Sequence, residues 1–86
     1  ITPQRGTLTT TAFPVRALAR DRSGIQAMFV SINGTKKKRA NAAAIAYTVR
    51  KLKQGTVTVT AYDALGNAKH AVLTIVRGRV VGVRYM

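Results

Sequence analysis

The fold is decided by the stretch TVTVTAYDALGN, residues 56–67. Its first half alternates small apolar residues with polar ones, so that Val57, Val59 and Ala61 fall on one face. The opposite face carries the threonines and Tyr62. A period of two with β-branched residues is typical of a strand that buries one face. We therefore expect a half-buried β-strand at 56–62.

This strand ends in a turn. Asp63 can accept backbone N–H bonds two or three residues on, and Gly66 and Asn67 tolerate a positive φ angle. Residues 15–25 repeat the formula, with small apolar residues at alternate positions followed by an Asp-x-x-Gly turn. Two strands that each end in such a turn predict a small all-β domain whose loops gather at the ends of a sandwich.

The rest of the chain contains further short stretches with β character. The dipeptide at 33–34, Asn-Gly, favours a tight turn, and we interpret residues 35–40 after it as a loop. The alanine-rich residues 40–44 could form a helix, but Asn41 interrupts this short segment, so we prefer a loop leading into a strand. Pro14 is expected to end the first strand because it has no N–H for a sheet. About seven short strands result, at 7–11, 15–20, 26–32, 45–50, 56–62, 69–76 and 80–86.

The size of the chain fits one domain. Because its 86 residues include no cysteine, packing alone must hold the core together. We assign residues 1–78 to the sandwich and residues 79–86 to a β-like extension or to the start of a following segment. Since the sequence begins at Ile1 rather than at methionine, we expect a fragment or a processed product. The apolar runs are too short to insert into a membrane.

Charge is the most unusual feature of the composition. Lysine and arginine number 15 against two acidic residues, which gives a formal net charge of +13. Such a field attracts nucleic acid, acidic polysaccharide or anionic lipid head groups. A plainer interpretation is that the cations keep exposed strand edges from pairing with other chains.

Residues with catalytic or metal-binding chemistry are few. Asp21 and Asp63 are the only acidic residues, whereas calcium usually takes six or more oxygen ligands, so we expect each aspartate to cap its own turn. His70 is the single histidine, and no cysteine, glutamate or Gly-x-Ser-x-Gly motif could complete a nucleophilic site with it. We therefore predict a protein that is not an enzyme and that has no cofactor or metal.

Three motifs in a fixed order carry a family resemblance. They are Val-x-Ala-x-Ala-x-Asp-x-x-Gly-Ile at 15–25, Met-x-Val-x-Ile-Asn-Gly-Thr at 28–35, and Leu-x-x-Gly-x-Val-x-Val-x-Ala-x-Asp-x-x-Gly-Asn at 52–67. Over residues 7–77 the chain resembles bacterial immunoglobulin-like domains, which are related in form to fibronectin type III and cadherin-like sandwiches. The resemblance implies an immunoglobulin-like antiparallel β-sandwich that serves as a spacer, adhesion or carbohydrate-contact module outside the cell or on its surface. Its structural turns are Asp21, Gly24, Asp63, Gly66 and Asn67.

The same resemblance implies where the charges gather. Alternate loops of an immunoglobulin-like sandwich share an end, so the turns at 21–24 and 63–67 would lie at one end. Segments 35–40, 50–54 and 77–79 would lie at the other, and their cations would form a binding surface for a polyanion or an acidic partner domain. These cations are Lys36, Lys37, Lys38, Arg39, Arg50, Lys51, Lys53, Arg77 and Arg79.

An outward row of apolar residues is expected on one sheet. Phe29, Tyr62 and Val72 could form a contact surface for a sugar, a base or a neighbouring subunit. Ordinary cross-strand pairing on an exposed face explains them as well, and we prefer that interpretation.

Two functions remain for comparison. The first is a non-catalytic immunoglobulin-like structural or adhesion module of a larger secreted, cell-surface, filament or virion assembly. Its partners would be neighbouring domains or subunits, with an acidic polysaccharide or another polyanion at its basic surface. The alternative is a small basic β-barrel that binds nucleic acid, which the charge favours. The chain has only two phenylalanines and three tyrosines for base stacking, so we prefer the first.

Overall fold

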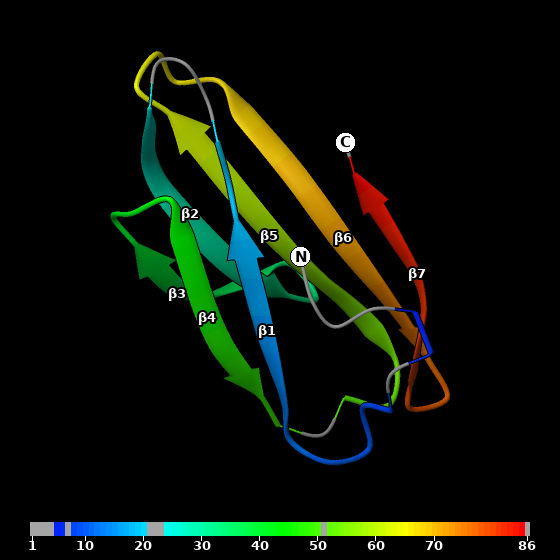
Figure 1. Ribbon diagram of the computed structural model, residues 1–86. Coiled ribbons are helices and arrows are strands. Elements are labelled where there is room, and N and C mark those ends of the chain that lie inside the picture. The colour runs from blue at the N-terminus through cyan, green and yellow to red at the C-terminus, as the bar shows by residue number, and fades with distance from the viewer. Residues whose placement is uncertain (1–4, 7, 21–23, 51, 86) are drawn as a thin grey trace.

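A computed structural model describes residues 5–6, 8–20, 24–50 and 52–85 of the chain. These residues contain strands and turns but no helix, as Figure 1 shows, and the predicted all-β fold is confirmed. Residues 40–44 therefore do not form the alternative helix. The strands are β1 (Phe13–Leu18), β2 (Ile25–Ile32), β3 (Thr35–Ala40), β4 (Ala44–Val49), β5 (Gly55–Asp63), β6 (Ala68–Val76) and β7 (Arg79–Tyr85).

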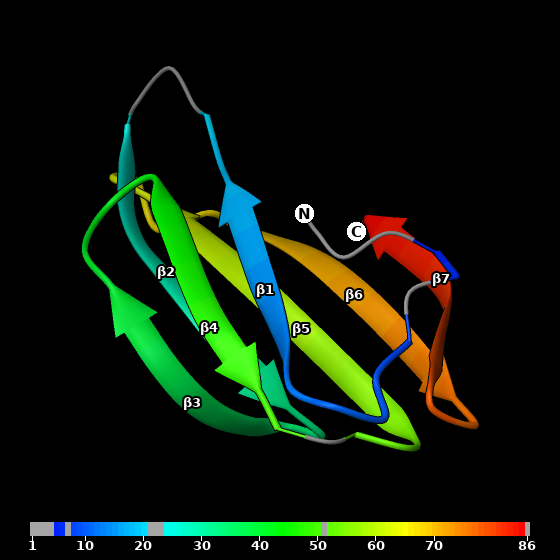
Figure 2. The same cartoon turned by 60° about the horizontal axis from the view of Figure 1, so that its bottom comes forward.

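The strands form two antiparallel sheets. The larger sheet has the order β3-β2-β5-β6-β7, and the smaller one consists of β1 and β4. Figures 1 and 2 show the smaller sheet packed over the β3-β2-β5 side of the larger one, while β6 and β7 extend beyond it. The molecule is therefore a two-layered β-sandwich with an open side and not a closed barrel.

The core lies between the two sheets. The alternation predicted for β5 is confirmed, since Val57, Val59 and Ala61 are buried and the threonines and Tyr62 face the other way. Burial of a valine, leucine or methionine side chain contributes about 1.5–3 kcal/mol, so these inward faces drive the packing of the sheets. The largest fully buried apolar side chains are Met28, Leu73, Ile75, Val15, Val30, Val49, Val57 and Val80.

The segment 35–40 is a strand, and the expected loop there was wrong. Asn33 and Gly34 have φ angles of 50° and 85°, which is the two-residue turn that matches the twist of a hairpin. This turn pairs Thr35 directly with Ile32, so the chain continues as β3 along the edge of β2. Lysine and arginine side chains suit this edge because they face solvent and discourage pairing with other chains.

Pro14 lies inside β1 instead of ending a strand. β1 pairs along its whole length with β4, and Pro14 stands opposite Thr48. The N–H of Ala19 donates to Ala43 O, and strict alternation along β1 then turns the nitrogen of Pro14 away from β4. A proline is tolerated there because that nitrogen has no hydrogen bond to make. In place of the strand expected at 7–11, described residues 8–11 contribute a single bridge, Leu8 with Arg79.

Residues 79–85 belong to the larger sheet. Arg77 and Gly78, with φ angles of 53° and 71°, form a second two-residue hairpin turn that pairs Val76 with Arg79. β7 runs back along β6, and the side chain of Val80 is fully buried in the core. No helix in the described ranges is long and apolar enough to cross a lipid bilayer.

Candidate functional site

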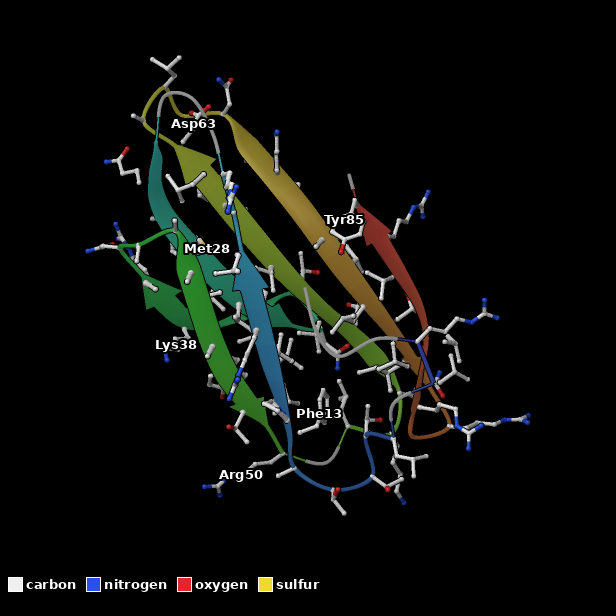
Figure 3. The ribbon with its side chains drawn as sticks, in the orientation of Figure 1. Phe13, Met28, Lys38, Arg50, Asp63 and Tyr85 are labelled. Carbon is white, nitrogen blue, oxygen red and sulfur yellow. The ribbon has the colours of Figure 1, made fainter. Side chains whose placement is uncertain are left out.

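The ends of the sandwich carry different chemistry. β5 runs from Gly55 to Asp63, and its nine residues, at a rise of about 3.3 Å per step, span about 26 Å of a molecule that is 38 Å long. At the Asp63 end, the N–H of Ala64 donates to Gly24 O at 3.1 Å, so the turn at 63–67 and Gly24 share one end. Asp21 lies outside the described residues. Figure 3 shows Asp63 at this end and Arg50 at the opposite one.

Asp63 organises its own turn. Its Oδ1 accepts the backbone N–H groups of Leu65 at 2.9 Å and of Asn67 at 2.8 Å, and its Oδ2 accepts the Asn67 side-chain amide at 3.2 Å. The side chain is only 6% exposed. This carboxylate therefore stabilises the turn at 63–67, which Gly66 and Asn67 close.

The opposite end brings three segments together. The N–H of Gly78 donates to Lys53 O at 2.7 Å, so the hairpin turn at 77–78 touches the corner that leads into β5. Lys53, Arg77 and Arg79 lie in or next to the two joined segments and are exposed, and exposed Arg50 lies at the same end in Figure 3. We call these four residues the basic end. Lys51 was predicted to join them and lies outside the described residues.

A threonine that the sequence interpretation missed ties this end together. Thr9 is fully buried, and its hydroxyl donates to Leu52 O at 2.6 Å. Its backbone N–H donates to Gly78 O at 2.7 Å, and its carbonyl accepts the N–H of Leu52 at 3.0 Å. Thr9 thus fixes the corner and the hairpin turn against each other. Nothing in the threonine-rich stretch 7–11 singles it out, because the contacts come from distant segments.

The cations at 36–39 do not join the basic end on a loop, because they lie on strand β3. β3 carries them along the edge of the larger sheet, from the turn at 33–34 toward the middle. Lys38 faces the smaller sheet, and its Nζ donates to Ala46 O of β4 at 2.7 Å, which links the two layers across their open edge. Lys36 and Arg39 instead lie on the outer face, over the ring of Phe29. The single cluster expected from the sequence is therefore divided between two places.

An open groove lies where the smaller sheet leaves the larger one uncovered. It has a volume of about 500 Å³ between β1 and the strands β6 and β7. The groove is lined by alanines at 17, 19, 61 and 71. It stays open because these small side chains do not fill the space between the layers. Lys69 and Tyr85 stand at its border.

The remaining polar residues give little chemistry. His70 on β6 stands opposite Thr60 on β5, and its Nδ1 shares a hydrogen bond of 2.9 Å with the threonine hydroxyl. In the described ranges, no group of three or more histidine, cysteine or acidic side chains could hold a metal ion.

Comparisons with protein-family models, with curated proteins and with solved structures find no match for this chain.

Proposed function

We propose that this protein is a non-catalytic immunoglobulin-like module of a larger extracellular or surface assembly. The observation that carries the proposal is the strand order. Strands β6-β5-β2-β3 follow one another as strands G, F, C and C′ do in an immunoglobulin sheet, and β1 and β4 face them as strands B and E do. β7 adds a further strand beside β6. Such a frame holds loops at fixed positions, which suits a protein that binds or spaces partners.

The basic end is the surface that we propose for an anionic partner. Its cations are exposed, and the hydrogen bonds of Thr9 and Gly78 hold together the backbone segments that carry Lys53 and Arg77. Asp63 lies at the far end of β5, about 26 Å from the start of that strand, and its buried carboxylate cannot neutralise them. The partner is an acidic domain, a neighbouring subunit or a polyanion such as an acidic polysaccharide.

Nucleic-acid binding remains the second candidate because the same charge attracts phosphates. The β-barrel predicted for this alternative is wrong, because the strands form two separate sheets. Nucleic acid therefore enters as one arm of the test.

The test is binding to immobilised heparin and to double-stranded DNA along a salt gradient. The variant Lys53→Glu/Arg77→Glu/Arg79→Glu reverses the basic end. Each phosphate contact contributes about −0.9 to the slope of log affinity against log salt, so the DNA slope should become shallower by roughly 2–3. Elution from heparin should shift to lower salt in parallel.

A matched control reverses three exposed cations elsewhere, as Arg20→Glu/Lys69→Glu/Arg84→Glu. It changes the net charge equally and should alter the slope by less than half as much. An equal loss in both variants would show diffuse attraction and would contradict the basic end.

A further inference from the structure

A second charged surface lies on the outer face of the larger sheet, away from the smaller sheet. Phe29 on β2 stands opposite Thr60 on β5 and opposite Arg39 on β3. Tyr62 lies two positions further along β5, and its ring meets the Phe29 ring edge to face with centroids 5.5 Å apart. Both aromatic side chains are half-buried, so they form a fixed apolar floor rather than mobile surface groups.

Two cations are held over this floor. The Nζ of Lys36 lies 4.5 Å from the centre of the Phe29 ring, and the guanidinium carbon of Arg39 lies 5.5 Å from it. Each contact stabilises its cation by attraction to the ring face. Arg39 is further oriented because its Nε donates to the side chain of Asn41 at 3.0 Å. Two positive groups therefore share one small region.

Nothing in the described part of the chain neutralises this pair with a salt bridge. Asp63 is the one acidic residue in the described ranges, and its carboxylate oxygens accept the amides of the turn at 63–67. Like charges held near one another without a carboxylate repel each other, and a bound anion would relieve that repulsion. A sulfate can accept charge-assisted hydrogen bonds from both an ammonium and a guanidinium group.

A shallow hollow of about 260 Å³ adjoins the two cations. It opens beside Tyr62 because Ala27 and Gly66 bring little or no side chain there, and Gln26 also lines it. The volume is below the range of about 300–1,000 Å³ that encloses drug-sized ligands, so the hollow suits one ring-sized unit of a longer chain.

We propose that this outer face binds an acidic polysaccharide through one sulfated sugar unit. The anionic group lies between Lys36 and Arg39, and the C–H face of the sugar packs on Tyr62. Nucleic acid fits less well, because the cations already cover Phe29 and because perpendicular rings give no platform for successive stacked bases. The inference rests on the proposed role as a binding module, but it uses none of the residues of the basic end.

The experiment compares two neighbouring lysines. Binding of a sulfated heparin tetrasaccharide is measured by calorimetry at physiological salt and mapped by amide NMR shifts. Lys36→Ala should weaken binding about tenfold, as expected for the loss of one charge-assisted hydrogen bond. Lys37→Ala is the matched control, because it removes the same charge from the same strand at a residue that does not line the hollow. It should weaken binding less than twofold.

A second comparison tests the aromatic floor, and its first variant leaves the net charge unchanged. Tyr62→Leu should weaken tetrasaccharide binding at least threefold, provided that its circular dichroism spectrum is native. If this variant does not fold, Arg39→Ala replaces it with an expected tenfold loss. The desulfated tetrasaccharide should bind at least tenfold more weakly than the sulfated one.

Three results would overturn the inference. The first is an equal loss of affinity for Lys36→Ala and Lys37→Ala, and the second is full affinity of Tyr62→Leu, or of Arg39→Ala where it replaces that variant. The third is binding of a thymidine oligonucleotide at Phe29 and Tyr62 that is tighter than binding of the tetrasaccharide. The variant with a reversed basic end keeps the NMR shifts at this face if the two sites are separate. Failure at the outer face with an intact salt response at the basic end leaves the proposed function standing.

Discussion

Replacing Asp63 with alanine should destabilise the domain more than any other single change to a polar side chain in the described turns. Two short hydrogen bonds to backbone N–H groups and a weaker one to the Asn67 side chain disappear together. At about 1 kcal/mol for each short bond, with a smaller share for the third, the expected loss is about 2–3 kcal/mol. A domain of this size is stable by about 4–13 kcal/mol, so a large fraction would be lost.

The assay is thermal and urea unfolding followed by circular dichroism. A loss of this size lowers the melting temperature of a small domain by about 10–20 °C. Asp63→Asn keeps an oxygen for the amides of Leu65 and Asn67, so it should lose less than half as much. Asn67→Ala removes only the 3.2 Å bond of its side chain and should cost less than about 1 kcal/mol. A loss below about 1 kcal/mol for Asp63→Ala would refute the role of these bonds, and equal losses for alanine and asparagine would assign the effect to charge instead.

Two further substitutions test the packing of the described chain. Ala71→Leu adds apolar surface in the open groove and should raise the free energy of unfolding by about 1 kcal/mol. As a control, Thr74→Leu on the exposed face of the same strand should give no gain. A lower melting temperature for Ala71→Leu would mean that the groove is closed in solution. Thr9→Val removes the buried hydroxyl that donates to Leu52 O and should lower the free energy of unfolding in urea by about 1–2 kcal/mol. Thr9→Ser keeps this hydrogen bond and serves as the control. Equal stability of Thr9→Val and the wild type would argue against a stabilising role of the bond.

The fold follows from the sequence because its strongest signals are local. The period of two in β5 fixes which face is buried, and the core then forms from Val57, Val59 and their neighbours. Turn chemistry is equally informative. Asn33 and Gly34 were identified as a tight turn, and a two-residue turn requires that the next residues pair with the preceding strand. The strand that follows was not predicted, because four consecutive cations at 36–39 are more typical of a loop.

The candidate sites were harder to predict because they depend on register between distant strands. The contact of Lys36 with Phe29 needs the exact pairing of β2 with β3, including the bulge between Val30 and Ser31. The network around Thr9 joins residues that are more than forty positions apart, such as Thr9 and Leu52. A pattern within one strand contains no information on either contact.

The position of the cations supports a role in binding beyond solubility. An excess of positive charge destabilises a compact state by self-repulsion, and protection of strand edges explains only cations on edges such as β3. Lys53 and Arg77 lie at a corner and in a turn, where there is no edge to protect. Arg77 also adopts a φ angle of 53°, a conformation that glycine or asparagine reaches at lower cost. A cation is thus held where both electrostatics and turn geometry disfavour it, and a partner with negative charge would account for both costs.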